Sequence, residues 1–363
     1  MGFRCGIVGL PNVGKSTLFN ALTNTAAAAA ENYPFCTIEP NVGQVPVPDP
    51  RLDAIAGLAK SARVVPTTLS FVDIAGLVRG ASKGEGLGNK FLAHIREVDA
   101  VIHVLRCFED DDVTHVDGRI DPVSDAETVE TELMLADLET LARRADTLGK
   151  RARGAADKEA RAQLAAVEAA QAALSEGIPL RAAKIEGMPD DLHLLTLKPV
   201  LYVCNVAEAE AATGNAHTRA VEAMAAKQGA GAVVISARIE AEVAQLGDPE
   251  EQRMFLADLG LEETGLARVI RAGYDLLGLL TFFTAGPKES RAWTVSAGAR
   301  APEAAGEIHT DFQRGFICAE TIAYDDYVKA GSEQAAKETG KMRQEGKDYA
   351  VHDGDVILFR FNV

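Results

Sequence analysis

Apolar and polar positions follow one pattern at the start of the chain and again after residue 196. There, short apolar runs typical of buried strands precede stretches with the spacing of helices. The apolar runs lie at residues 3–8, 69–73, 100–108, 202–205 and 232–236. Strands that alternate with helices in this way predict a parallel sheet of the α/β class.

Residues 124–195 instead carry the pattern of two long amphipathic helices. Ser124 and Glu127 have the spacing of a capping box at the start of the first helix. Apolar residues then recur at helical spacing as far as Leu148, and a second stripe after Gly154 reaches Leu174. Two long helices joined by a tight link predict an antiparallel hairpin inserted into the α/β region.

The pattern changes again at about residue 279, where short strands dominate. The segments "LLTFFTAG", "RAWTVSAG", "FICAETIAY" and "DVILFRF" are expected to be strands, and "APEAAGEIHTDFQ" is expected to be the one helix among them. This combination fits a β-grasp module over residues 279–363. His309 could be functional, but we favour a hydrogen bond at a helix end.

The charge balance limits the partners. Net charge is −16, with 53 acidic and 37 basic residues, which argues against general binding to nucleic acid or to an anionic membrane. The tip of the predicted hairpin differs, because residues 143–161 hold seven Lys/Arg and three Asp/Glu. That tip fits either contact with RNA or an ordinary solvated helix face.

Cysteine use and hydropathy bear on the compartment. The five cysteines form no Cys-x-x-Cys pair, which fits a reducing environment and free thiols. No signal-peptide pattern opens the chain, and no uncharged run reaches the ~18 residues that a membrane span needs. We therefore expect a cytoplasmic protein with no membrane partner.

The first candidate for chemistry is Gly9-x-x-x-x-Gly14-Lys15-Ser16, between the first apolar run and a helical stretch. This strand–loop–helix setting distinguishes a P-loop from an accidental glycine turn. Backbone N–H groups of such a loop surround phosphate oxygens, Lys15 would reach the β and γ phosphates, and Ser16 would hold Mg²⁺. The predicted phosphate-binding residues are Asn12, Val13, Gly14, Lys15, Ser16 and Thr17.

Asn12 has two interpretations that stay open. In some P-loop GTPases an asparagine at this place helps to hold K⁺ beside the phosphates. Asparagine is also a common turn-former that tolerates left-handed backbone geometry.

Two further segments supply candidate metal and γ-phosphate contacts. Thr37, in "NYPFCTIEPNVG", is a candidate second Mg²⁺ ligand, and Asp73-x-x-Gly76 ends an apolar strand. Asp73 would hold Mg²⁺ through water, and the Gly76 N–H would contact the γ-phosphate. Five glycines follow within residues 76–88, which fits either a switch loop ordered by nucleotide or a flexible connector.

The segment at 205–208 bears on the choice of base. Many GTPases carry Asn-Lys-x-Asp at this strand end, but here Val206 replaces the lysine and Glu208 replaces the aspartate. Glu208 cannot hold the bidentate pose that reads guanine, whereas Asn205 can pair with adenine N6 and N7. Ser236 lies in the predicted last loop around the base. These residues predict a nucleotide site directed at ATP.

Together, these motifs resemble the Obg-like ATPase (YchF) family of the TRAFAC P-loop class. The resemblance spans Met1 to Val363 and includes "GIVGLPNVGKSTLFNALT", "FVDIAGLVRGASKGEGLGNKFL" and "AGEIHTDFQRGFI". It implies a preference for ATP over GTP, association with the ribosome, a C-terminal TGS domain and sensitivity to oxidation. The expected domains are a nucleotide-binding domain at 1–123 and 196–278, the hairpin at 124–195 and the TGS domain at 279–363.

The residue that usually aligns the attacking water is replaced in this chain. Many GTPases have a glutamine directly after Asp-x-x-Gly, but this chain has Leu77, which cannot form a hydrogen bond. His115 in the polar loop "EDDDVTHVDG" is the candidate catalytic residue, and the resemblance supports such a histidine. His103 lies inside a predicted strand and is expected in the core.

Cys36 directly precedes the candidate ligand Thr37. It could be a redox-sensitive thiol or a small buried apolar side chain.

The prediction from sequence is an ATP-hydrolysing molecular switch. Its cofactors would be Mg²⁺ and, if Asn12 serves as in some relatives, K⁺. Its partners would be ATP and the ribosome, with RNA contact through the hairpin tip and the TGS domain. The alternatives are a regulatory module that binds nucleotide with incidental hydrolysis, and a plain GTPase.

Overall fold

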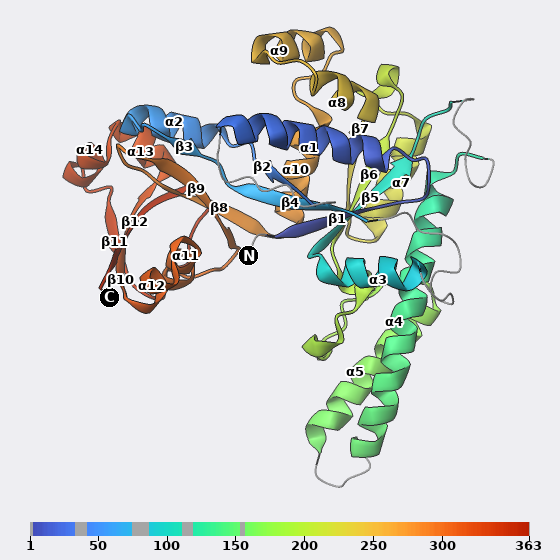
Figure 1. Ribbon diagram of the computed structural model, residues 1–363. Helices are drawn as coiled ribbons and strands as arrows, with labels where there is room; N and C mark the ends of the chain where they lie inside the picture. Colours follow the sequence, from blue (N-terminus) through green and yellow to red (C-terminus); the bar gives the residue numbers. More distant parts are fainter. Residues whose placement is uncertain (1–2, 33–41, 75–86, 111–118, 153–156, 363) are drawn as a thin grey trace. The chain divides into compact units, whose positions relative to one another are not determined.

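A computed structural model describes residues 3–32, 42–74, 87–110, 119–152 and 157–362 (Figure 1). Its contacts divide the chain into two compact units. The first holds residues 1–28, 36–45 and 70–276, and the second holds residues 29–35, 46–69 and 277–363. None of the helices that the structure describes combines the length and apolar character needed to cross a membrane.

The first unit is built on a six-stranded sheet in the order β2-β4-β1-β5-β6-β7. The strands are β1 (Arg4–Val8), β2 (Val42–Pro46), β4 (Thr68–Asp73), β5 (Ala100–Arg106), β6 (Val200–Asn205) and β7 (Gly231–Ile235). β1 runs parallel to β4 and β5, and β6 runs parallel to β5 and β7. All residues of β5 and β6 are buried, as expected for central strands covered on both faces. The predicted α/β fold is confirmed.

Nine helices belong to the part of this unit that the structure describes. They are α1 (Lys15–Asn32), α3 (Leu87–Glu97), α4 (Pro122–Ala152), α5 (Lys158–Ser175), α6 (Leu180–Ala183), α7 (Ala216–Lys227), α8 (Ala237–Val243), α9 (Pro249–Asp258) and α10 (Gly265–Leu276). Short 3₁₀ turns lie at Asp190–Leu192, Leu195–Leu197 and Glu208–Glu210. α4 and α7 pack on one face of β5–β7, and α10 packs on the other.

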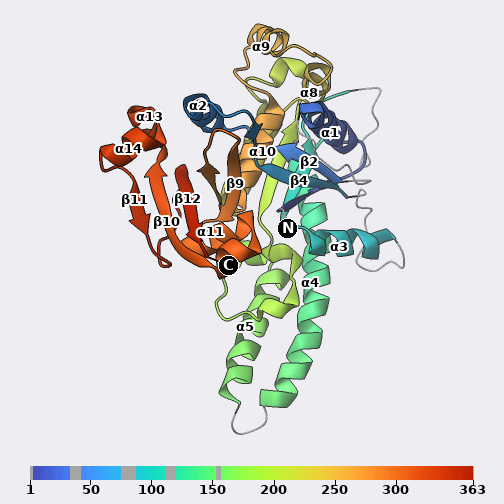
Figure 2. The same ribbon diagram turned by 60° about the vertical axis from the view of Figure 1, so that its left-hand side comes forward.

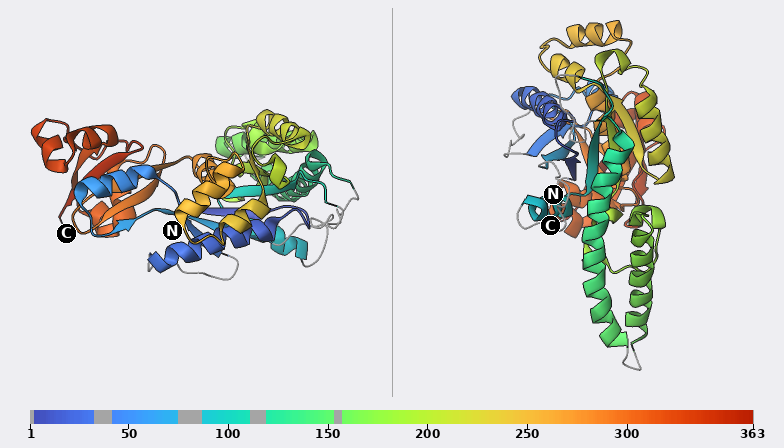
Figure 3. Two further views of the ribbon diagram at one scale, coloured as in Figure 1. Left: turned by 90° about the horizontal axis from the view of Figure 1, so that it is seen from above. Right: turned by 90° about the vertical axis from the view of Figure 1, so that its right-hand side faces the viewer.

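The predicted antiparallel hairpin is present as α4 and α5, which pack against each other and lie side by side in the right-hand view of Figure 3. Its core consists of Leu141, Leu148, Ala160, Val167, Ala170, Leu174, Leu180 and Leu194. The predicted cap at Ser124 was wrong, because the helix begins two residues earlier. The Ser124 N–H donates to Asp121 Oδ1 at 3.1 Å, and Pro122 occupies the first turn, where its missing N–H costs nothing.

The second unit holds a sheet in the order β11-β10-β12-β8-β9-β3 (Figure 2). Its strands are β3 (Val64–Val65), β8 (Leu279–Thr284), β9 (Ser290–Ser296), β10 (Phe316–Ala323), β11 (Arg343–Glu345) and β12 (Asp355–Phe361). Two apolar clusters fill it, one around Phe282 and Phe359 and one around Phe283 and Ile322.

The prediction of one helix in this region was wrong. The structure has α11 (Ala301–Ile308), α12 (Thr310–Arg314), α13 (Tyr324–Ala330) and α14 (Glu333–Glu338). His309 separates the first two, because its extended backbone ends α11 and its Nδ1 accepts from the Asp311 N–H at 3.2 Å. This is the helix-end hydrogen bond expected for His309.

Residues 46–69 pack in the second unit, although the expected boundaries put them in the nucleotide-binding domain. They contain α2 (Pro50–Ala59) and β3, which pairs with β9 in parallel. Ser61 Oγ donates to Gly286 O at 2.8 Å, and the hydroxyl oxygens of Thr67 and Thr294 lie 2.6 Å apart. The second sheet is therefore completed by a segment from the N-terminal part of the chain.

Candidate nucleotide-binding site

The predicted P-loop connects β1 to α1. Its backbone has positive φ at Gly9 (153°), Asn12 (62°) and Gly14 (98°). A Cβ at Gly9 would lie 2.5 Å from Val104 O, and one at Gly14 would lie 2.3 Å from Asn205 Nδ2. Both positions therefore require glycine. Asn12 adopts the left-handed geometry of its turn-former interpretation, and its interpretation as a K⁺ ligand stays a prediction.

Lys15 and Asp73 bring opposite charges to the end of the sheet. Lys15 opens α1, and its Nζ donates to Leu10 O at 2.6 Å. Burial lowers the pKa of Lys15, while the Asp73 charge acts in the opposite direction. Asp73 ends β4 beside Ile7 of β1, and burial raises the pKa of its carboxyl against the effect of Lys15. The ammonium and carboxylate are thus held close to the P-loop, as the motif requires.

Ser16 and Thr17 follow Lys15 in the first turn of α1, and both are exposed. A serine hydroxyl and the Asp73 carboxylate are hard oxygen ligands of the kind that Mg²⁺ binds. The described residues contain no cluster of three or more His, Cys, Asp or Glu side chains that would form a cage for a metal ion. The donor set therefore fits Mg²⁺, which usually takes one or two protein oxygens together with phosphates and waters.

Asn205 connects two parts of the site that are far apart in the sequence. Its Nδ2 donates to Val13 O in the P-loop at 3.0 Å, and its Oδ1 accepts from Ala237 N at 2.9 Å. The residue is only 5% exposed. The structure thus gives this amide a positioning role that the sequence did not predict, and its pairing with adenine stays a prediction.

The other predicted base-site residues lie around Asn205. Val206 is buried, and its N–H donates to Ile235 O at 2.8 Å. Glu208 opens a short 3₁₀ turn, and its Oε1 lies 2.7 Å from Arg238 Nε. Ser236 is buried directly before α8, and its Oγ has no hydrogen-bond partner among the described residues.

Arg238 is a residue of the candidate site that the sequence did not predict. It lies two residues after Ser236 and also approaches Glu242 at 3.7 Å. The only signal in the sequence was a basic residue just beyond the predicted base loop.

Several predicted site residues lie outside the described residues. They are Cys36, Thr37, Gly76, Leu77 and His115, and their roles stay predictions.

His103 is in the core, as expected. It lies on β5, 3% exposed, with its ring centroid 5.6 Å from that of Tyr202. Burial lowers its pKa to about 3, helped by the charges of Lys15 and Arg181. His103 is therefore a neutral packing residue behind the P-loop.

A P-loop that runs into a helix, an aspartate at the end of the neighbouring strand and an asparagine that bridges to the last loop define a P-loop NTPase of the GTPase type. Residues 4–137 match a family described as "50S ribosome-binding GTPase". Residues 279–362 match the family named YchF-GTPase_C, described as a protein of unknown function.

Known relatives match over almost their whole length. "Ribosome-binding ATPase YchF" of Haemophilus influenzae is 58% identical over 367 residues, covering 100% of both chains. "Obg-like ATPase 1" of Rattus norvegicus is 44% identical, covering 99% of this chain and 92% of the rat protein. The solved structure of the Schizosaccharomyces pombe YchF GTPase has a TM-score of 0.89 at 35% identity, covering 99% of this chain and 98% of that one. The chain belongs to the YchF family.

Proposed function

We propose that this chain is an ATPase that prefers ATP to GTP and acts as a molecular switch on the ribosome. Its relatives are named as ribosome-binding ATPases. A ribosomal partner would place it in the cytoplasm.

The observation that supports ATP over GTP is the ion pair between Glu208 and Arg238. A guanine-reading carboxylate accepts hydrogen bonds from N1–H and the 2-amino group of the base. Here the Glu208 carboxylate is one methylene longer and is paired with Arg238. Val206 is buried and offers no stem along the base. Adenine has no 2-amino group and presents an acceptor at N1, so it needs no carboxylate at this place.

The mechanism follows from the phosphate side. Lys15 would bind the β and γ phosphates through its ammonium group, and the P-loop N–H groups would orient them. Ser16, Asp73 and the predicted ligand Thr37 would hold Mg²⁺, which neutralises phosphate charge when bound. His115 would align the water for in-line attack, because Leu77 cannot. The Gly76 N–H would contact the γ-phosphate, so its loop would be ordered while that phosphate is bound.

Calorimetry with ATP and GTP tests the nucleotide preference. We expect ATP to bind at least several-fold more tightly, since one bidentate base contact discriminates by about 1–3 kcal/mol. The double variant Val206→Lys with Glu208→Asp should gain affinity for GTP. Equal affinity of the natural chain for both nucleotides would overturn the preference.

Turnover with and without ribosomes tests the switch. Groups supplied by a partner can accelerate hydrolysis by about 10³–10⁵. Strong stimulation would support the switch enzyme, whereas ATP-dependent ribosome binding without stimulation would favour the regulatory module. His115→Ala should lower kcat while ATP affinity barely changes. If kcat is unchanged, exchanging K⁺ for Na⁺ tests Asn12 as part of a K⁺ site.

A further inference from the structure

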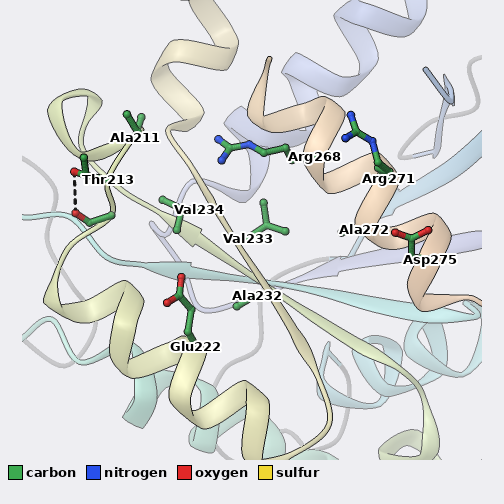
Figure 4. A pocket seen from close by; sticks show the side chains of 12 residues that line it. Ala211, Thr213, Glu222, Ala232, Val233, Val234, Arg268, Arg271, Ala272 and Asp275 are labelled. Carbon is green, nitrogen blue, oxygen red and sulfur yellow. Dashed lines mark hydrogen bonds between the residues drawn. The ribbon is translucent and has the colours of Figure 1, made fainter. Parts of the chain in front are cut away.

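A cleft of about 470 Å³ lies beside strand β7 (Figure 4). Its floor is formed by Ala232, Val233 and Val234 of β7. Arg268 and Arg271 of α10 line one wall, and Glu222 of α7 lines the other. The loop at 211–214 closes one end. No role proposed above uses this cleft.

Among the strands that the structure describes, β7 is the last of its sheet, so one of its edges has no neighbouring strand there. Ile235 O accepts from Val206 N, which directs the backbone groups of Ile235 toward β6. Backbone groups alternate in direction along a strand, so those of Ala232 and Val234 point away from β6, into the cleft. An edge strand of this kind is a template for pairing with another extended chain.

The α10 wall of the cleft carries two arginines and one aspartate, and the α7 wall carries one glutamate. Arg268 and Arg271 come from the same face of α10, one turn apart, and Asp275 follows a turn later. The Nε of Arg268 is buried and has no hydrogen-bond partner among the described residues. Arg271 is paired with Glu263, and its side chain is still 56% exposed. On the α7 side, Glu222 is exposed.

We propose that the cleft binds an extended acidic segment of a partner protein by strand addition to β7. Main-chain hydrogen bonds to Ala232 and Val234 would supply affinity. Side chains of an added strand alternate between the two sheet faces. Acidic residues at alternate positions would therefore face Arg268 and Arg271, and the residues between them, small or basic, would face Glu222.

A second copy of this chain fits the cleft less well. Two identical β7 strands paired antiparallel would be related by a two-fold axis perpendicular to the sheet. That axis puts α10 beside α10 of the other copy, so the arginines of the two copies would share one face. With an acidic peptide in place of the second copy, carboxylates would lie beside these arginines and no like charges would meet.

Binding of synthetic peptides to the full chain tests the proposal. The probe is a fluorescent seven-residue peptide with Glu at positions 2, 4 and 6 and Thr, Val or Lys between them. It should bind in a saturable way, and the same peptide with Lys at positions 2, 4 and 6 should bind roughly tenfold more weakly or not at all. Equal binding of the two peptides would overturn the charge assignment.

Two N-methylated forms of the probe test strand addition itself. One is methylated at the even backbone nitrogens and the other at the odd ones. In a paired strand only alternate N–H groups face the neighbour, so one form should lose binding and the other should keep it. If both forms bind like the parent peptide, the attraction is purely electrostatic and the proposal fails.

Two protein variants complete the test. Ala232→Pro removes an outward N–H, and proline is tolerated where an edge-strand N–H faces solvent. Arg271→Glu reverses one wall charge at an exposed position. Each should weaken peptide binding roughly tenfold while ATP binding and unfolding midpoint stay unchanged. Undiminished peptide binding by both folded variants, or self-association through β7 in sedimentation experiments, would overturn the proposal.

Discussion

At the scale of single residues, the buried side-chain amide of Asn205 makes two hydrogen bonds. It satisfies the Val13 carbonyl of the P-loop and the Ala237 N–H of the last loop. A change at this residue would therefore act on the predicted phosphate side as well as on the predicted base side.

We expect Asn205→Ala to raise the Kd for ATP by roughly 5- to 150-fold, since each unpaired buried group costs about 1–3 kcal/mol. Asn205→Asp keeps the acceptor for Ala237 but puts a carboxylate against the Val13 carbonyl, so it should also weaken binding. Calorimetry measures both, with the exposed Asn20→Ala on α1 as the matched control. An affinity equal to that of the control would show that the bridge is dispensable.

His103 should make stability depend on pH. Its pKa is about 3 when folded and about 6.5 when unfolded, so below pH 6.5 the unfolded chain binds a proton that the folded chain refuses. The free energy of unfolding therefore decreases as pH falls from about 6.5 toward about 3, by up to about 1.4 kcal/mol per pH unit from this group. Urea unfolding of the natural chain and of His103→Leu between pH 7 and 5 measures it. As pH falls, the free energy of unfolding should decrease more for the natural chain than for His103→Leu. Equal decreases in the two proteins would contradict the lowered pKa of His103.

At the scale of elements, one buried ion pair ties the base of the hairpin to the nucleotide domain. Arg181 on α6 donates to both carboxylate oxygens of Glu130 on α4, at 2.9 and 2.7 Å, and also to Gln228 at the end of α7. Both charged side chains are 8% exposed. Gln228 in turn accepts from the Tyr202 hydroxyl of β6 at 2.8 Å.

Removing one partner of this pair should be costly. Glu130→Ala leaves the Arg181 charge buried without its partner and should lower the free energy of unfolding by about 3–5 kcal/mol. Glu130→Leu together with Arg181→Met should recover much of that loss, because no unpaired charge remains. Chemical denaturation measures both variants. A double variant no more stable than the single one would mean that the surrounding polar groups, rather than the pair, dominate the cost.

Comparison of the elements shows which features could be predicted from the sequence and which could not. The P-loop was predictable because its glycines, lysine and flanking elements are neighbours along the chain. The role of Asn205 was not, because Val13 and Ala237 approach it only in the folded sheet. The start of α4 was misplaced because Ser124 and Asp121 are both good caps, and only the backbone shows which one accepts. Residues 46–69 gave no signal that β3 pairs with β9.

At the scale of the whole molecule, charge is distributed unevenly. The chain carries −16 overall, yet the described part of the hairpin tip presents basic side chains. Arg143 is exposed and its Nη1 lies 3.7 Å from Glu139 Oε1, and Arg151 pairs with Asp157 at 3.0 Å. Surface pairs of this kind contribute little to stability, so their charges remain available to a polyanion.

We expect Arg143→Glu with Lys150→Glu to weaken association with ribosomes and to flatten its dependence on salt. Each phosphate contact removed should lower the salt slope by about one. Basal ATP turnover should be unchanged, because these residues lie on the hairpin. Co-sedimentation across a salt series measures the slope, and Glu139→Gln with Asp146→Asn provides the opposite charge change as a control. An unchanged slope would mean that the hairpin tip makes no phosphate contacts and is an ordinary solvated helix face.

The hydrogen bond from Lys15 Nζ to Leu10 O has a consequence for turnover. A buried ammonium group is costly when it loses its partner. The Leu10 carbonyl offers such a partner within the same loop, so the lysine would exchange this carbonyl for a phosphate oxygen when nucleotide binds. If Lys15 binds the γ-phosphate as proposed, departure of the cleaved phosphate would leave the ammonium group paired with the Leu10 carbonyl, so its loss of the phosphate partner would cost less.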